Sequence, residues 1–379
     1  MGPGFASVER TPRTMSTMHR ILSVLLLGTA TVAYSGCEEA GLERTEAVPE
    51  ETISVLVLDT LVTAESGEIG VVASLALGPE GRVWIADEAN HRLLVVDPDG
   101  GPTRRIGREG SGPGEFIRPR GIAASASGVS VFDFGNRRIV RLGPSGEHLA
   151  SEPLVGPAFV PVGMNQKGTL ASNSLGREGS LVELRAPGQE MPSLRGLARS
   201  RMPMEISPAR VREQARGGEV PVEFRNNTLP VLGAGGELWF VLQSDGTMEH
   251  YDPDGNLVWS RLLDQPEVGA ALERFFSAWA GSVTGVPVPW IARWGVQVGD
   301  EVWLMMDGVG PSGSTILILD GASGEPRRRI VLELEGRAGP FAVDREGRSL
   351  YLSLVDDPTL LRVPARHLEA ALDAVPWEP

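Results

Sequence analysis

Apolar and polar residues alternate through most of this chain in short runs, and turns rich in Gly, Pro, Asn and Asp separate the runs. The segments VWIAD (83–87) and VSVFD (129–133) are typical. A period of two between turn residues predicts β-strands that bury one face. The pattern therefore predicts an all-β protein.

One part of the pattern occurs twice in a recognisable form. Residues 81–100 read GRVWIADEANHRLLVVDPDG, and residues 128–146 read GVSVFDFGNRRIVRLGPSG. Both contain the spacing D-x-x-N-x-R, and both end in a glycine turn. A repeat of roughly 40 to 50 residues with several short strands per unit is the signature of a β-propeller.

The strand pattern divides into six blades of about 42 residues each. The innermost strands of the six blades are expected to start near Val71, Arg120, Val160, Leu229, Val296 and Pro340. The sixth blade lacks a fourth strand, whereas the run ISVLVLD at 53–59 has no blade of its own. We expect residues 53–59 to complete blade six, because closing the ring in this way leaves only short strand edges.

The repeated polar positions carry a family resemblance. The spacing D-x-x-N-x-R-[LI], together with GSGPGEFIRPRGIA between the two repeats, resembles the NHL-repeat family of six-bladed propellers, here in a bacterial lipoprotein version. The match rests on Asp87 and Asn90 in blade one and on Asp133 and Asn136 in blade two. Their repetition favours a structural role, and we expect these four side chains to cap turns between the second and third strands.

The N-terminal residues have the features of an export signal. Ile21–Ala33 is an apolar run of 13 residues behind Arg20, too short to span about 30 Å of hydrocarbon. The run ends shortly before Cys37, the only cysteine in the chain. This arrangement resembles a bacterial lipoprotein signal, in which the cysteine is lipidated after cleavage. A plain secretory signal and a buried core thiol are the alternatives.

The sequence thus predicts four parts. They are a lipoprotein signal peptide at 1–36, an acidic tether at 37–52, the propeller at 53–366 and a C-terminal helix or tail at 367–379. The expected location is the bacterial cell envelope, where the lipid would anchor the protein to a membrane facing the periplasm or the cell exterior. A single cysteine excludes a disulfide framework.

The charge of the chain bears on its partners. The net charge is −14, and loss of residues 1–36 removes three arginines and one glutamate, which leaves −16. An acidic surface repels phosphate backbones, so nucleic acid is not an expected partner.

Sequence motifs for catalysis and for metal binding are not found. The chain has no G-x-S-x-G, no H-E-x-x-H and no paired-cysteine spacing. The glycine-rich stretch 107–115 lacks the Lys-Ser/Thr of a phosphate-binding loop and is expected to be an interblade turn. The DPDG tracts at 97–100 and 252–255 lack the further acidic positions of an EF-hand and are expected to be β-turns. No catalytic residue, metal ligand or cofactor is predicted.

The connections between strands differ in length. If the strands of a blade are named a to d from the inside out, the a–b and c–d turns share one face of the ring, and the b–c and d–a connections share the other. The a–b and c–d turns are tight, whereas the d–a links at 102–119, 197–228 and 265–295 are long. Long loops in a compact domain are usually functional, so the d–a face is the expected binding face.

Two of the long links are predicted to contain helices, which places two helical inserts on one face of the ring. In 207–217 a serine N-cap precedes proline, and 266–280 has apolar residues at helical spacing. These inserts are expected to roof the d–a face. The candidate partner-binding residues there are Arg210, Arg212, Arg216, Trp290 and Trp294. The alternative is that these side chains only cover the ring or contact solvent.

The sequence favours a lipid-anchored propeller that binds a protein or a small-molecule ligand on its d–a face. One alternative is a propeller enzyme, such as a metal-dependent lactonase or lyase with its site in the central channel. Another is a purely structural subunit of an envelope complex. Metal ligands clustered at successive starts of strand a would favour the enzyme, but the expected residues there are mostly apolar.

Overall fold

The structure, a computed structural model, describes residues 43–45, 50–54, 58–99, 102–125, 127–155, 161–201, 203, 207–281, 287–307, 313–344, 349–364 and 368. The predicted lipidation site Cys37, the signal peptide and all of the predicted C-terminal helix except Leu368 lie outside these residues. None of the helices in the described part is long and apolar enough to cross a membrane.

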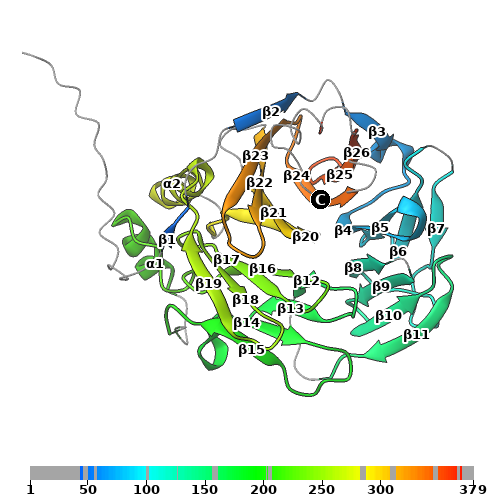
Figure 1. The fold of residues 1–379 in the computed structure, drawn as a ribbon, viewed down its shortest axis with the longest axis horizontal. Helices are drawn as coiled ribbons and strands as arrows, with labels where there is room; N and C mark the ends of the chain where they lie inside the picture. Colours follow the sequence, from blue (N-terminus) through cyan, green and yellow to red (C-terminus); the bar gives the residue numbers. More distant parts are fainter. Residues whose placement is uncertain are drawn as a thin grey trace, which may run out of the picture. The chain divides into compact units, whose positions relative to one another are not determined.

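The described strands form six sheets, of which four have four strands and two have five. Figure 1 shows the sheets arranged around a common centre, with one strand of each sheet innermost. Successive innermost strands are neighbours, and the innermost strand of the last sheet contacts that of the first. This architecture is a six-bladed β-propeller, which confirms the predicted fold class.

The strands of each blade are ordered a to d from the centre outward. Blades one to three contain β4 (Val72–Leu77), β5 (Val83–Asp87), β6 (Arg92–Val96), β7 (Arg104–Ile106), β8 (Pro119–Ser125), β9 (Gly128–Asp133), β10 (Arg138–Leu142), β11 (His148–Pro153), β12 (Pro161–Met164), β13 (Leu170–Asn173), β14 (Ser180–Arg185) and β15 (Ser193–Leu197). Blades four to six contain β16 (Thr228–Leu232), β17 (Leu238–Leu242), β18 (Thr247–Tyr251), β19 (Leu257–Leu262), β20 (Ala292–Val298), β21 (Glu301–Met306), β22 (Gly313–Asp320), β23 (Pro326–Glu333), β24 (Ala338–Asp344), β25 (Ser349–Leu354) and β26 (Leu360–Val363).

Blade six is closed by a strand from the N-terminal part of the chain, but the strand is not the predicted one. Strand β3 (Asp59–Val62) pairs antiparallel with β26, whereas most of the run 53–59 lies before it. The pattern misplaced this strand because an outer strand buries few side chains. Of the four residues in β3, only Val62 is buried.

The segment predicted as an acidic tether also contributes strands. Strand β1 (Glu43–Arg44) pairs parallel with β19 of blade four, and β2 (Glu50–Ser54) pairs parallel with β23 of blade five. Thr45 is buried against the end of β19, where its Oγ1 accepts a hydrogen bond from Asp264 N at 3.1 Å. The described residues between 43 and 62 therefore follow the outer edges of three successive blades, and residues 43–44 and 50–52 of the predicted tether pair with the ring.

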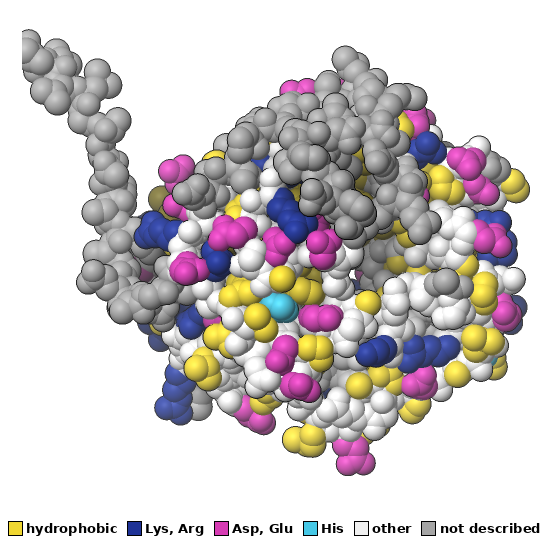
Figure 2. Space-filling view, viewed as in Figure 1, with side chains coloured by type: hydrophobic (Ala, Val, Ile, Leu, Met, Phe, Trp, Pro, Cys, Tyr) yellow, Lys and Arg dark blue, Asp and Glu magenta, His cyan; other side chains and the backbone are white. Residues whose placement is uncertain are grey.

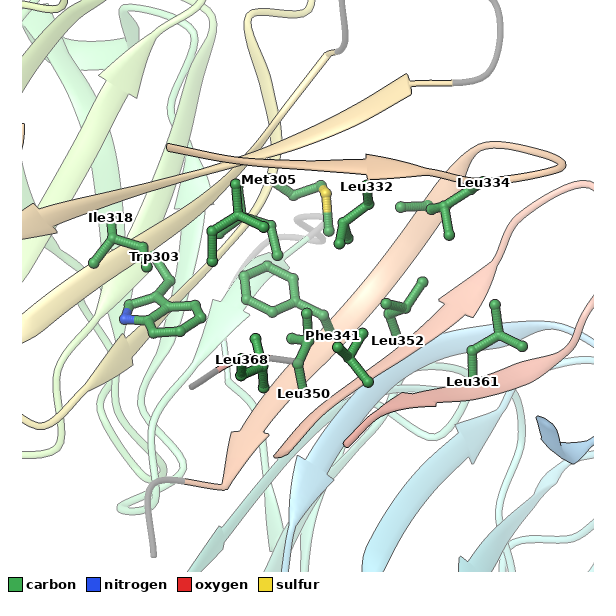
Figure 3. Close-up of a cluster of buried hydrophobic side chains, with 14 of the residues drawn as sticks. Trp303, Met305, Ile318, Leu332, Leu334, Phe341, Leu350, Leu352, Leu361 and Leu368 are labelled. Atoms are coloured by element: carbon green, nitrogen blue, oxygen red, sulfur yellow. The ribbon is translucent and has the colours of Figure 1, made fainter. Parts of the chain in front are cut away.

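The hydrophobic core is divided among the six junctions between neighbouring blades. Each junction has its own cluster of buried side chains. The cluster between blades five and six includes Trp303, Met305 and Phe341 (Figure 3). Because every cluster needs both adjoining blades, the ring is stabilised as a whole and not blade by blade.

The two predicted helices are present in the d–a links. Helix α1 (Pro208–Arg216) begins at Ser207, whose hydroxyl accepts the Arg210 N–H, and α2 (Pro266–Ala280) begins with proline at its first position. The helices pack on each other through a cluster that includes Val211, Phe275 and Trp279. Figure 1 shows them outside β19, at the rim of the ring. They lie beside the sheets and not over the centre of the ring.

Candidate binding face

The d–a face is built on two repeated polar clusters. In blade one the buried carboxylate of Asp87 accepts hydrogen bonds from Gly70 N and Val71 N, both at 3.2 Å, and from Asn90 Nδ2 at 2.7 Å. Arg92 Nε lies 3.5 Å from the same carboxylate. The aspartate thus joins the incoming link to the b–c turn.

The same arrangement recurs in blade two. Asp133, also fully buried, accepts from Ile117 N at 2.8 Å, from Asn136 Nδ2 at 2.7 Å and from Arg138 Nε at 2.9 Å. The other nitrogens of Arg138 donate to backbone carbonyls of the d–a link, including Glu115 O at 2.8 Å. These contacts are those expected of turn caps, and they also hold the long link in place.

The glycine-rich link between blades one and two is folded around a carboxylate. Glu115 Oε2 accepts from Gly112 N at 2.8 Å, and its other oxygen pairs with Arg108 at 2.7 Å. The hydrogen bond from Gly112 and the contact with Arg108 lower the pKa of Glu115 below its ordinary value. A carboxylate of the chain itself therefore occupies the loop, in keeping with an interblade turn.

A β-bulge interrupts the start of strand a in five of the six blades. In blade two, Pro119 and Gly121 of β8 pair with two consecutive residues of β9, which leaves Arg120 as the extra residue. In blade five it passes from Ala292 to Trp294, which leaves Arg293 in the same position. Bulges of this kind re-aim a side chain and occur often beside functional sites.

Arg120 lies in a compact cluster between blades one and two. Its Nε and Nη2 contact Glu88 Oε1 at 2.9 and 2.8 Å, and Arg118 donates to the same oxygen from Nε at 2.9 Å and Nη2 at 2.6 Å. The guanidinium of Arg120 also lies over the ring of Phe134, 4.3 Å from its centroid. His91 Nδ1 accepts the Arg118 backbone N–H at 3.0 Å. Two cations therefore share one carboxylate here.

Arg293 has a parallel environment in blade five. Its Nε donates to Asp307 Oδ1 at 2.5 Å, and Arg274 of α2 donates to Asp307 Oδ2 at 2.9 Å. The Arg293 guanidinium lies 5.8 Å from the ring centroid of Trp290. Again two cations share one carboxylate next to an aromatic ring.

The arginines predicted on α1 have different positions. Arg210 pairs with Glu223, whose carboxylate is fully buried, so its charge neutralises an internal group. Arg212 and Arg216 are exposed on the rim, and within the described residues no ion pair is found for either. The structure does not bring these three arginines together with Arg120 or Arg293.

The two predicted tryptophans lie in different environments. Trp290 is 40% exposed and lies beside Arg293. Trp294 is part of β20 and packs against the core between blades five and six. Only Trp290 is placed where a ligand could contact it.

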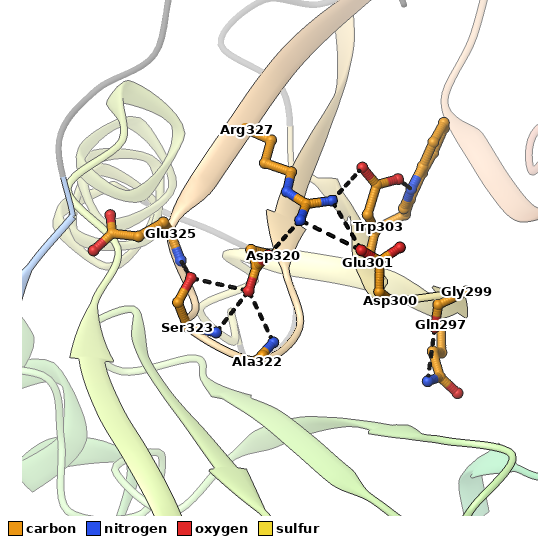
Figure 4. A network of polar contacts seen from close by, with 10 residues as sticks. All are labelled: Gln297, Gly299, Asp300, Glu301, Trp303, Asp320, Ala322, Ser323, Glu325 and Arg327. Carbon is orange, nitrogen blue, oxygen red and sulfur yellow. Dashed lines mark hydrogen bonds and ion pairs between the residues drawn. The ribbon is translucent and has the colours of Figure 1, made fainter. Parts of the chain in front are cut away.

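The opposite face carries the tight turns, and the charged groups of one network on this face pair with one another. In blade five, Arg327 contacts the carboxylates of Asp300, Glu301 and Asp320 (Figure 4). Burial alone would raise the pKa of Asp320, but hydrogen bonds from Ser323 and the charge of Arg327 lower it. Figure 2 shows acidic and basic side chains interspersed over the face in view.

Metal binding and the buried His250 also bear on the chemistry of the molecule. Among the described residues no group of three or more His, Cys, Asp or Glu side chains could hold a metal ion. His250 is buried between Trp239 and Trp259, at centroid distances of 4.6 and 5.6 Å, and the residues that the structure describes supply no hydrogen-bond partner for either ring nitrogen. Burial lowers the pKa of His250, although Glu237 and Asp252 oppose this effect.

Sequence reasoning missed most of the arginine clusters. Arg120 was expected near the start of strand a, but Arg293 was not, because that strand was placed from Val296. The strand begins at Ala292 in the structure. The available signal was the pair Trp290 and Trp294, one on each side of Arg293. Counting these aromatic residues toward the strand would have placed its start before the arginine.

One family match agrees with the ring architecture. A family described as "6-bladed beta-propeller" matches residues 47–156. Among solved structures, the chain is similar to a streptogramin B lyase, with 14% identity, coverage of 80% of this chain and 96% of that chain, and a TM-score of 0.44. It is also similar to a putative exported protein from Bacteroides fragilis, with 12% identity, coverage of 83% and 98%, and a TM-score of 0.43. The WD40 repeats of RRP9 match with 12% identity, coverage of 82% and 98%, and a TM-score of 0.46.

Proposed function

We propose that this chain is an exported, lipid-anchored propeller that binds a partner or ligand through its d–a face at the bacterial cell envelope. The membrane anchor would be the lipid on Cys37, and the ring would be the binding module. This proposal combines the sequence signal at residues 21–37 with the geometry of the ring.

The observation that carries the proposal is the pair of arginine clusters at the starts of strands β8 and β20. In each cluster two guanidinium groups share one carboxylate, so each has an excess positive charge on a chain with a net charge of −14. Arg120 and Arg293 are only 27% and 30% exposed. Half-buried arginines beside aromatic rings are typical of energetically important interface positions.

A pair of matched double variants tests the face. Arg120→Gln with Arg293→Gln removes two charges from the d–a face, and Arg82→Gln with Lys167→Gln removes two from the a–b and c–d face. We expect the first variant to lose most of the envelope components that co-purify with the wild-type protein, and the second to retain them. Equal retention by both variants, with unchanged melting temperatures, would contradict the proposed face.

A further inference from the structure

We infer that the d–a face binds an elongated ligand with two carboxylate groups, one held by Arg120 and the other by Arg293. This inference rests on the proposed function, because it names the ligand class of the same face. It depends on the positions of the two arginines, on their remaining hydrogen-bond donors and on the charge around them.

The two arginines belong to blades on opposite sides of the ring. Innermost strands β4, β8, β12, β16, β20 and β24 contact one another in this order, and β24 contacts β4. Blades two and five are therefore separated by two blades in either direction. Since Arg120 and Arg293 occupy the same bulge position in these blades, they lie on opposite sides of the centre at the same face.

Each arginine has donors left for a ligand. Nε and Nη2 of Arg120 both contact Glu88 Oε1, and the described residues supply no acceptor for Nη1. Arg293 uses Nε for Asp307, and no acceptor for its two terminal nitrogens is found in the described part of the chain. A planar guanidinium with free N–H groups matches the two oxygens of a carboxylate.

The local charge favours an anion at both positions. Glu88 is shared by Arg118 and Arg120, and Asp307 is shared by Arg274 and Arg293, so one positive charge remains in each cluster. The aromatic rings of Phe134 and Trp290 lie against the two guanidinium groups and restrict their orientation. A ligand that places one carboxylate at each cluster gains both interactions at once, whereas a small monoanion gains one.

Isothermal titration calorimetry of the full-length protein in detergent tests this inference. The probes are linear saturated dicarboxylates of increasing length and monocarboxylates of the same lengths. We expect affinity to reach a maximum at one dicarboxylate length. We expect Arg120→Gln and Arg293→Gln each to weaken binding of that probe by about tenfold or more, to the level of the monocarboxylate.

Two further variants distinguish a specific loss of binding from a loss of folding. Glu88→Gln removes the carboxylate that competes for Arg118 and Arg120, and it should tighten binding of the best dicarboxylate. The double variant Arg82→Gln with Lys167→Gln on the opposite face should leave the affinity unchanged. Dicarboxylates that bind no more tightly than monocarboxylates, or bisphosphonates of equal length that bind more tightly, would overturn the ligand assignment.

The two experiments together distinguish an error in the ligand class from an error in the proposed binding face. If dicarboxylates fail but the arginine variant still loses co-purifying envelope components, the ligand class is wrong and the proposed function stands. If the opposite-face variant alone loses those components, both are wrong.

Discussion

At the scale of single residues, buried polar groups determine much of the d–a face. Asp87 and Asp133 each accept hydrogen bonds from a backbone N–H of the preceding link and from an asparagine. Arg138 also donates to Asp133, whereas Arg92 Nε lies 3.5 Å from Asp87 as an ion pair. The spacing D-x-x-N predicts caps of the b–c turn, because the aspartate and the asparagine lie three residues apart. It does not indicate the contacts with the preceding link, which span 16 or 17 positions. The contacts of Glu88 with Arg118 and Arg120 span 30 and 32 positions, and no local pattern indicates them.

Replacing Asp133 tests the cap directly. Asp133→Ala leaves Ile117 N and the Arg138 guanidinium without their buried acceptor, so we expect a loss of about 3 kcal/mol in the free energy of unfolding. Asp97→Ala, at a half-exposed turn position, should cost less than about 1 kcal/mol. Urea denaturation of both variants measures the difference, and equal losses would show that the cap contributes little.

His250 gives the stability of the ring a dependence on pH. Because its pKa is lower in the folded protein than in the unfolded chain, the folded state takes up fewer protons. The contribution of His250 to the free energy of unfolding is complete above a pH of about 6.5. It falls as the pH drops below that value, and it stops falling below the pKa of His250 in the folded state. We expect His250→Gln to show a shallower decline between pH 7 and pH 5 in denaturant titrations. Parallel curves for the two proteins would argue against this role of His250.

At the scale of elements, the inner strands were more predictable than the outer ones. Inner strands are buried on both faces and bounded by turns, as in β5 and β9, whose predicted and observed limits agree within one residue. Outer strands bury few side chains, and β1 and β2 pair with β19 and β23 at long sequence separation. Their partners could not be deduced from periodicity.

Two truncations separate the roles of the N-terminal strands. A chain that starts at residue 58 loses β1 and β2 but keeps β3, and we expect it to remain folded with a lower melting temperature. A chain that starts at residue 64 also loses β3, which exposes the edge of β26 and opens blade six. We expect this protein to aggregate. Light scattering and thermal melts distinguish them, and a soluble second protein with the melting temperature of the first would refute closure by β3.

The buried ion pair between α2 and blade five fixes the position of that helix. Glu267 Oε1 accepts from Arg329 Nε at 2.8 Å, and both side chains are at most 9% exposed. We expect Glu267→Gln to increase amide hydrogen exchange in α2, whereas Glu273→Gln, at an exposed position of the same helix, should not. Unchanged exchange in both variants would mean that apolar packing alone holds α2.

At the scale of the whole molecule, the ring architecture followed from the repeat because propeller blades are similar units in a closed series. The candidate site could not be predicted from the repeat, because it depends on which residues occupy the bulges at the starts of the innermost strands. The repeat predicted the blade, but only the structure shows that blades two and five place arginine at the same bulge.

The proposed anchoring of the whole protein depends on Cys37. We expect Cys37→Ala to move the protein from the membrane fraction to an uncleaved or soluble exported form, because the acyl chains would supply the anchor. Cell fractionation with an antibody to the propeller measures this. The same membrane-bound fraction with normal processing in the variant would contradict lipidation.

Hydrogen exchange of the intact protein, with and without the dicarboxylate that binds best, tests the central claim most directly. The account predicts protection at the starts of β8 and β20, in residues 117–121 and 290–294, on opposite sides of the ring. Protection confined to the a–b and c–d turns, such as 79–82, 165–168 and 321–325, would contradict binding at the d–a face.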